Sequence, residues 1–523
     1  MIGLLKSRHL VSFALSGALW AMGSAFAAQT ASAITIVHTN DLLGELEPCG
    51  CRTNPLGGMA RKANLLKRTD DKEIIQLDGG DLLFSTDQLP DALKKQSLLQ
   101  AKYLLKAMDQ THHDAAVPGE KDFALGLSTF QKLTKETKVK FIAANLKAKS
   151  GKKLFEPHLL LKRKDTNGKT VTVAVIGLVG EKLNWPKDLK ASPAIAAAKA
   201  EVSALKSKAD YIVALTHQGL EQDEALAKAV PGIDLIVGAH TQSFLQAPPT
   251  VGKTLIVQSS FRNQYVGLVP LTHPLNVENY KLVGLDPSYD SPAQAPSAMD
   301  DLVKEFKTAV AELNTREEAE ESARLISSNS GNSTKFHTFP RCAECHLKQF
   351  EFWRKTPHAR AMEPLIAAKQ AQNKECLSCH TVGLGDPKGF EFVTRLAEIR
   401  HGDETTPMPV DELHAYLKSM TEASSLDTQV KLGSNGQAQP LRQSLNSLSR
   451  SFAPVQCENC HQPGQGHPFT GTYSKQVDTS QTCLKCHTPE RAPEWYKGND
   501  PDWKTIEAKR AKMTCPAGEL TTE

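Results

Sequence analysis

The 523-residue sequence is poor in aromatic residues, in net charge and, over most of its length, in cysteine. Aromatic residues make up 6 %, and 62 Lys and Arg face 58 Asp and Glu, which gives a formal net charge of +4. This near balance excludes the strongly basic surface that is typical of nucleic-acid-binding or polybasic membrane proteins. Two cysteines precede residue 340 and nine follow it, which excludes a disulfide framework through the whole chain. The length predicts two or three domains.

Long apolar runs are also missing after the first thirty residues. Lys6 and Arg8 precede an apolar run over 9–21 and a small-residue cleavage site that ends at Ala27. These features predict a secretory signal peptide over residues 1–27 and a periplasmic protein. A membrane anchor is the alternative, but the run falls short of the roughly 20 apolar residues that a spanning helix needs. We therefore expect no transmembrane anchor after signal cleavage.

Residues 34–285 alternate short runs rich in Val and Ile with longer helical stretches. This alternation predicts an α/β domain with a central sheet, in which ligands bind at the carboxyl ends of the strands. Residues 286–335 are first rich in Pro, Ala and Ser and then in charged residues. They predict a linker with a charged, solvated helix that acts as a spacer. From residue 336 onward we expect no strands.

The region 336–510 holds four copies of the motif Cys-x-x-Cys-His. The four motifs consist of Cys342, Cys345 and His346; Cys376, Cys379 and His380; Cys457, Cys460 and His461; and Cys483, Cys486 and His487. Two such thiols can attach one haem, and the adjacent histidine then ligates the iron. Chance would give fewer than about 0.01 copies. Zinc knuckles and redox Cys-x-x-Cys pairs are the alternatives, and export and the adjacent histidine argue against them. The motifs predict four covalent haem c groups in a mostly helical, haem-packed cytochrome domain over 336–510.

A c-type haem iron commonly takes a second axial ligand, His or Met. Five histidines outside the motifs are available for this role: His337, His358, His401, His414 and His467. Four haems can use at most four of them, so the residues alone leave the assignment open.

The cytochrome region resembles the tetrahaem cytochrome c family that accepts electrons from hydroxylamine oxidoreductase. The stretches that carry the resemblance run from Trp353 to Ala359 and from His461 to His467. The resemblance implies that His358 and His467 are distal ligands. His337 and His401 are further candidates among the remaining histidines. It also implies electron transfer through closely stacked haems to periplasmic redox partners or other cytochromes.

The first half places acids and histidines at successive strand ends. The candidate metal ligands are Asp41, Asp81, Glu120, His217, His240 and Gln242. Such residues can converge on a divalent metal ion. Taken singly, each has a plainer explanation, such as a helix cap or a buried hydrogen-bonding histidine.

Residues 34–285 resemble the 5′-nucleotidase/UDP-sugar hydrolase group of calcineurin-like metallophosphoesterases, through HTNDLLGELEP, GGMAR, LDGGD, LTHQG and GAHTQ. The resemblance implies a four-layer α/β/β/α sandwich that holds two metals. It assigns Asp81 as the bridging ligand, Asp41 and Gln242 to one metal, and His217 and His240 to the other. Arg61 matches as well.

The departures from that family lie at the metal site. Leu43 replaces a histidine ligand, Glu120 replaces an asparagine ligand, and Lys121 replaces the catalytic histidine. A lysine cannot act as a neutral-pH acid in the same way, although it can stabilise an anion. We therefore expect one divalent ion, such as Zn, Mn or Fe, rather than two. The family's C-terminal nucleotide-binding domain is absent, so nucleotide specificity is not implied.

A Pro-Cys-Gly-Cys insertion places Cys49 and Cys51 just after the first strand. The pair is open to four interpretations: a redox disulfide, thiolate ligands, a persulfide carrier or a structural loop staple. It resembles a subgroup of hydrolase-like (seleno)proteins, which implies redox use. Three functions therefore remain. The first is redox chemistry on a small molecule such as a sulfur compound, with Cys49, Cys51, Lys121 and Arg61 as catalytic candidates. The others are phosphoester hydrolysis and a docking scaffold. Cys515 has no predicted role.

Overall fold

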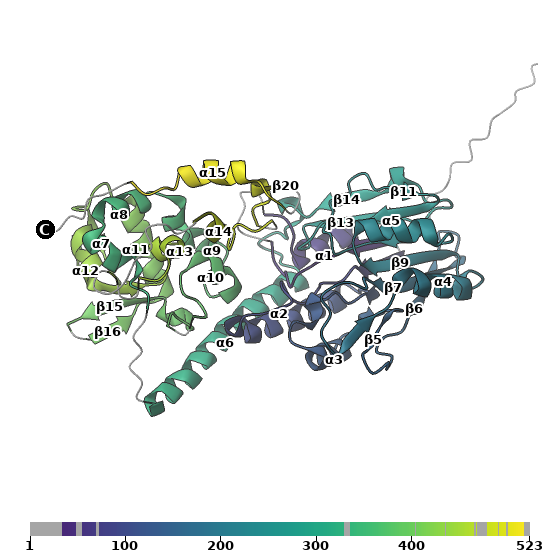
Figure 1. Cartoon of the computed structure of the whole chain (residues 1–523), viewed down its shortest axis with the longest axis horizontal. Helices are drawn as coiled ribbons and strands as arrows, with labels where there is room; N and C mark the ends of the chain where they lie inside the picture. The colour runs from purple at the N-terminus through teal and green to yellow at the C-terminus, as the bar shows by residue number, and fades with distance from the viewer. Residues whose placement is uncertain are drawn as a thin grey trace, which may run out of the picture.

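The computed structural model describes residues 34–48, 55–69, 73–328, 335–386, 388–402, 404–434, 436–464, 467, 479–489, 491–497 and 500–516. The predicted signal peptide and the Cys49 and Cys51 pair lie outside these residues. The chain forms two lobes that lie side by side, with a long helix running obliquely between them (Figure 1). The two large sheets lie in one lobe and the four Cys-x-x-Cys-His motifs in the other.

The first lobe contains two six-stranded mixed sheets. One has the order β14 (Lys281–Gly284), β13 (Tyr265–Pro270), β1 (Ile34–Thr39), β2 (Glu73–Asp78), β3 (Ala115–Ala116), β4 (Lys140–Phe141). The other has the order β11 (Thr250–Val251), β12 (Thr254–Val257), β10 (Leu235–Val237), β9 (Tyr211–His217), β7 (Thr170–Val179), β6 (His158–Lys164). A two-stranded ribbon joins β5 (Leu146–Ala148) to β8 (Leu189–Ala191).

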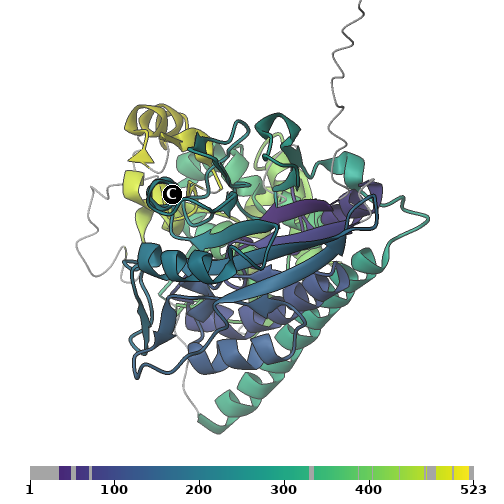
Figure 2. The ribbon, with the colours of Figure 1, turned by 90° about the vertical axis from the view of Figure 1, so that its right-hand side faces the viewer.

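Apolar alternation along the strands packs the two sheets face to face. Ile36 and Ile75, neighbours in register on the parallel strands β1 and β2, share a buried cluster with Val175 and Val213 of the other sheet. The outer faces are covered by helices: α1 (Met59–Arg68), α2 (Asp91–Gln110), α3 (Leu127–Lys135), α4 (Ala194–Leu205) and α5 (Leu220–Ala229). Figure 2 shows the stacked sheets with helices on both sides. The four-layer α/β/β/α arrangement expected from the sequence is therefore present.

The predicted charged helix is α6 (Ala298–Ser328), but it is more than a solvated spacer. Its first half buries one apolar stripe against α2: Met299, Leu302, Phe306, Val310 and Leu313. Most of these side chains belong to the same core cluster as Leu104 and Met108 of α2. The spacing of three and four residues places them on one helix face. The beginning of the linker is thus part of the first lobe.

The second lobe is mostly helical. Its helices are α7 (Thr338–Cys345), α8 (Leu347–Trp353), α9 (Met362–Ala367), α10 (Lys374–His380), α11 (Val410–Glu422), α12 (Leu441–Ser447), α13 (Cys457–His461), α14 (Thr479–Cys483) and α15 (Trp503–Ala511). The expectation that strands disappear was wrong, because a small sheet joins β16 (Glu404–Pro407), β15 (Ala397–His401) and β19 (Leu448–Ser451). Two ribbons pair β17 (Gln429–Lys431) with β18 (Ala438–Pro440), and β20 (Tyr496–Lys497) with β21 (Asp500–Pro501).

This lobe also has an apolar core of its own, in which Trp353, Leu377, Tyr416 and Phe452 are buried together. The sheet strands contribute Ala397 and Leu448 to that core. Within the described part of the chain, no helix has the length and hydropathy to cross a membrane.

Candidate functional site

Four predicted metal ligands converge at one edge of the first lobe. Asp81 follows β2, His217 ends β9, and His240 follows β10, while Glu120 precedes a short 3₁₀ turn. Because β9 and β10 are parallel, as are β1 and β2, their carboxyl ends bring these side chains together. Asp81 and His240 have positive φ angles of 52° and 77°. Such backbone costs about 1–3 kcal/mol at a non-glycine residue and is concentrated at functional sites.

One ligand atom from each of Asp81, Glu120, His217 and His240 lies within 4.8 Å of the others. His217 Nε2 is 3.0 Å from Glu120 Oε2 and 3.6 Å from Asp81 Oδ1, and His240 Nδ1 is 3.4 Å from Glu120 Oε1. The other ring nitrogen of His217 lies 2.8 Å from the Gly79 carbonyl. This contact fixes the ring so that Nε2 points into the cluster. Two carboxylates and two imidazoles suit a divalent ion such as zinc.

The charges of this cluster depend on one another. Burial alone would lower the pKa of His217, but the carboxylates of Asp81, Glu120 and Asp41 raise it to about 10. Burial would raise the pKa of Glu120, but hydrogen bonds and charge interactions with His217 and His240 hold it far below its usual range. The protonated imidazole of His217 therefore supplies positive charge of the kind that a metal ion would supply.

Asp41 also faces the cluster. Its Oδ2 accepts hydrogen bonds from Asn40 Nδ2 at 2.9 Å and from the His240 backbone at 3.1 Å. Its Oδ1 is buried and has no hydrogen-bond partner among the described residues. An unpaired buried carboxylate oxygen costs free energy unless a cation or water binds it, so Asp41 fits as a further ligand. Gln242, by contrast, makes no hydrogen bond to the cluster in the part of the chain that the structure describes.

Lys121 and Leu43, the two replacements that led us to expect a single metal ion, both lie beside Asp81. The ammonium group of Lys121 forms an ion pair with Asp81 Oδ2, and its backbone N–H donates to Asp81 Oδ1 at 3.0 Å. Burial would lower the pKa of Lys121, but Asp81, Asp41 and Glu120 raise it well above its usual value. Leu43 is buried and offers no ligand atom. Lys121 thus occupies one side of the predicted bridging carboxylate with a fixed positive charge.

The structure places Arg61 outside this cluster. Its guanidinium pairs with Asp290 and donates to the carbonyl oxygens of Pro55 at 2.6 Å and Leu285 at 3.1 Å. Arg61 therefore ties the beginning of the linker to α1, and it is a structural contact here rather than a group that faces the metal ligands.

Two residues that support the cluster were not singled out in the sequence. Asn40 bonds Asp41 and the backbone of Ser259, and so joins β1 to the opposite sheet. Asp122 accepts from the Leu82 and Gly119 backbones at 2.8 Å each, which locks the Asp81 and Glu120 loops together. A signal for both was present, because each is a polar residue close in sequence to a predicted ligand.

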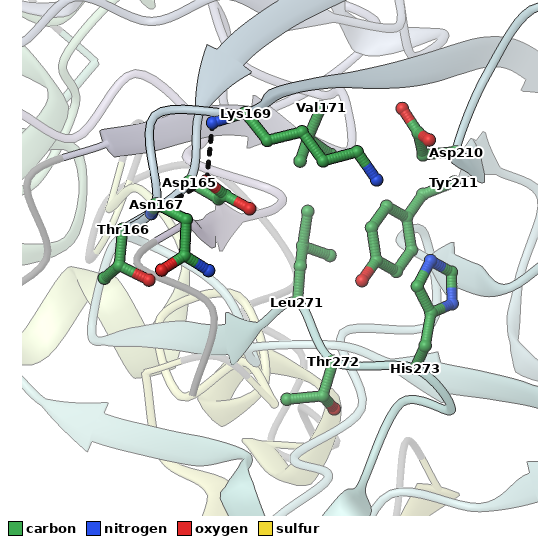
Figure 3. Close-up of a pocket in the computed structure, with 10 residues that line it drawn as sticks. All are labelled: Asp165, Thr166, Asn167, Lys169, Val171, Asp210, Tyr211, Leu271, Thr272 and His273. Carbon is green, nitrogen blue, oxygen red and sulfur yellow. Dashed lines mark hydrogen bonds between the residues drawn. The ribbon is translucent and has the colours of Figure 1, made fainter. Parts of the chain in front are cut away.

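A separate pocket of about 210 Å³ lies at the opposite ends of the strands (Figure 3). Tyr211, which begins β9, stacks on His273 with ring centroids 4.1 Å apart, and Lys169 and Asp165 of the β6–β7 turn complete the rim. His217 ends the strand that Tyr211 begins. The pocket is therefore distinct from the metal-ligand cluster.

The four haem-attachment motifs lie next to one another in the second lobe. Helix α7, which carries the first motif, contacts α13, which carries the third, and Cys342 and Cys457 act on each other's pKa. Cys486 Sγ lies 3.8 Å from the Cys379 carbonyl oxygen, which places the fourth motif beside the second. Helix α13 of the third motif also contacts α14, which ends at Cys483 of the fourth. The motifs form one contiguous group, with Cys515 beside the third motif.

Two predicted distal histidines face motif histidines at the separation that a shared iron requires. The ring centroids of His346 and His467 are 5.9 Å apart, and those of His358 and His487 are 6.3 Å apart. With metal–nitrogen bonds of about 2 Å, two imidazoles on one metal have centroids about 6 Å apart. The residues present therefore fit bis-histidine haem iron at the first and fourth motifs.

Other motif surroundings also fix the histidine rings. Trp495 stacks on His487 with centroids 4.1 Å apart and planes 7° apart. His380 Nδ1 lies 2.5 Å from the Ala361 carbonyl, the orientation that leaves Nε2 for a metal. His337 Nε2 is buried without a hydrogen-bond partner among the described residues, so this nitrogen suits an iron ligand.

His401 does not lie beside the motifs. It is exposed on the β15–β16 hairpin, where its Nε2 lies 3.1 Å from Thr406 Oγ1. Among the described residues, the structure brings His401 to no haem-attachment motif. His414 is half-buried on α11.

Known proteins match two separate parts of this chain. The family described as "Cytochrome c554 and c-prime" matches residues 341–402. Human 5′-nucleotidase is 28 % identical over 262 residues, which are 45 % of this chain and 42 % of that protein. A snake venom 5′-nucleotidase of Gloydius brevicauda is 26 % identical over 255 residues, again 45 % of this chain and 42 % of that protein. The chain thus spans less than half the length of these relatives.

Among solved structures, a 5′-nucleotidase precursor from Thermus thermophilus is 25 % identical with a TM-score of 0.43, and the match covers 54 % of this chain and 59 % of that one. The sequence relatives and the two mixed sheets identify the first lobe as a 5′-nucleotidase-like metallophosphoesterase domain. The family match in the second lobe indicates a c-type cytochrome, which implies haem.

Proposed function

We propose that this protein is an exported, tetrahaem c-type cytochrome that transfers electrons and carries a divergent metallophosphoesterase-like domain. The observation that carries the proposal is the pairing of His346 with His467 and of His358 with His487. The ring centroids of each pair lie at the separation expected of two imidazoles that share one iron. Haem iron held by two histidines supplies reversible one-electron chemistry. The contiguous motif thiols support haems close enough for electrons to pass between them.

The chain's own residues would hold and orient each haem. The motif cysteines attach the porphyrin, and the motif histidine supplies the proximal nitrogen. Trp495 restrains the ring of His487, and the Ala361 carbonyl restrains that of His380. Such contacts fix the orientation of the ligand ring and influence the reduction potential of the iron that it would bind.

Haem content is the direct test. The intact mass of the purified protein should exceed that of the mature polypeptide by four haems, and acidified organic solvent should extract none. A Cys376→Ala/Cys379→Ala variant should lose one haem mass. A Cys515→Ala variant, which leaves the motifs intact, should retain all four. The proposal would be contradicted if acidified solvent extracts the haem, or if the Cys376→Ala/Cys379→Ala variant still carries four haems.

In the first domain, Asp81, Glu120, His217 and His240 would hold one divalent ion, with Asp41 as a further ligand. Such an ion supplies Lewis-acid chemistry. The Lys121–Asp81 ion pair and the apolar Leu43 weigh against a second ion. We therefore favour redox chemistry over phosphoester hydrolysis, with a docking scaffold as the remaining alternative.

We further propose that a small sulfur compound reacts at Cys49 and Cys51. Glu47 and Pro48 are the last described residues before the pair, and Glu47 contacts Lys307 and Gln370 at the junction with the cytochrome. A substrate thiol would reduce the Cys49–Cys51 disulfide by exchange: two substrate thiols become one substrate disulfide and the two cysteines become thiols. Reoxidation of the two cysteines to the disulfide releases two protons and two electrons, enough to reduce two ferric haems. Substrate-dependent haem reduction, followed at the Soret band, should disappear in Cys49→Ser/Cys51→Ser. If haem reduction is unchanged in this variant, the two cysteines have only a structural role in their loop.

A further inference from the structure

The junction between the two lobes is built at one haem-attachment helix. Segment 368–375, which leads into α10, receives contacts from α2, from α6 and from the loop after β1. Asn314 Nδ2 donates to the Gln372 carbonyl at 2.9 Å, and Lys374 Nζ pairs with Glu317 Oε2 at 2.5 Å. Lys374 is 4 % exposed. A buried lysine that is paired in this way indicates a specific interface rather than a tether.

Gln96 of α2 holds the beginning of α10. Its Nε2 donates to Asn373 Oδ1 at 2.6 Å, and its Oε1 accepts from the Lys374 backbone at 2.9 Å. Asn373 is the N-cap of α10, because its Oδ1 also accepts from the Glu375 backbone. The amide of Gln96 thus uses both its donor and its acceptor on the cap of the helix that carries Cys376.

Gln100 of the same helix holds the metal-ligand loop. Its Nε2 donates to the Gly44 carbonyl at 2.7 Å, in the loop that follows Asp41. Backbone bonds from Leu43 to Asp81 at 2.9 Å and from Gly44 to Leu82 at 2.7 Å join this loop to the Asp81 loop. Gly44 has a φ of +83°, and a Cβ there would lie 3.1 Å from Gln100 Nε2, so glycine permits this approach.

Gln96 and Gln100 are four residues apart and therefore lie on one face of α2, a single turn from each other. Both are buried, at 2 % and 7 % exposure. We propose that these two glutamines couple the metal-ligand cluster to the haem carried by Cys376 and Cys379, and to no other haem directly. They act as positioning residues: metal binding orders the Asp41 loop, and α2 transmits that order to the cap of α10. This inference rests on the proposed metal and haem sites.

The test is a spectroelectrochemical titration of the holoprotein with and without Zn²⁺, which is redox-silent. We expect Zn²⁺ to raise the midpoint of one of the four haem steps, and His380→Met to identify that step as the haem of the second motif. Because reduction and Zn²⁺ binding are thermodynamically linked, Zn²⁺ should bind the reduced protein more tightly than the oxidised protein, by the factor that corresponds to the shift in midpoint. A tenfold preference corresponds to about 59 mV for a one-electron couple.

The variant Gln96→Leu/Gln100→Leu should lose most of this shift while retaining four haems and one Zn²⁺. Gln110→Leu, at the exposed end of the same helix, should keep it. If Zn²⁺ shifts the midpoint equally in the double variant, the coupling is direct electrostatics and the inference is overturned. It is also overturned if Zn²⁺ shifts the midpoint of a different haem, or of no haem. If the double variant does not fold, equal Zn²⁺ affinity of oxidised and reduced wild-type protein overturns it instead. Failure of the haems to titrate at all would reject the proposed function itself.

Discussion

Removal of one distal histidine should open one haem without disturbing the other three. In His358→Ala, the imidazole 6.3 Å from the His487 ring is replaced by a methyl group, which cannot reach the iron. We expect a quarter of the total haem to change from low to high spin and to bind carbon monoxide, one molecule per chain beyond the wild-type amount. His467→Ala should produce the same increment at the haem of His346.

Carbon monoxide titration of the dithionite-reduced protein, followed at the Soret band, measures these increments. The double variant should bind two additional molecules, because the two pairs contain no residue in common. His401→Ala is the matched control and should bind none, because His401 lies on an exposed hairpin beside Thr406. If His358→Ala and His467→Ala bind no more carbon monoxide than the control, the ring pairs do not mark shared irons.

Three further changes test the other lobe and its packing. Elemental analysis should find one divalent ion per wild-type chain and two in Leu43→His/Lys121→His, because the double change restores a ligand and removes the ion pair with Asp81; equal content would refute this. Arg61→Ala should lower the free energy of unfolding by about 1–2 kcal/mol, mainly through loss of its buried hydrogen bond to the Leu285 carbonyl, because its partner Asp290 is exposed; elemental analysis should find the metal content unchanged. Phe306→Ala should cost about 3–5 kcal/mol in denaturant titration, since the side chain is 3 % exposed; a loss below about 1 kcal/mol would make α6 a spacer.

Local chemistry explains what could be predicted from the sequence. A Cys-x-x-Cys-His motif contains its attachment sites within five residues, so its meaning does not depend on the fold. Asp81, His217 and His240 follow recognisable strands, and parallel strands bring their ends together. These predictions required only short-range pattern and one topological rule.

Long-range pairings could not be predicted in the same way. Nothing near Cys342 indicates that its neighbour is Cys457, and nothing near Gln96 indicates Asn373. The apolar stripe of α6 was visible at spacings of three and four residues, but the abundance of charge concealed it. The assignment of Arg61 to the site failed to anticipate Asp290, whose carboxylate pairs with it from the linker.

The Lys121 ammonium is a cation that cannot diffuse away. Since it is covalently attached and paired with Asp81, the acidic loop retains a positive neighbour when a divalent ion departs. Folding of this edge of the sheet is thereby separated from metal supply. A chain without the ion would keep this edge of the sheet folded, and binding of the ion would then add order only to the Asp41 loop.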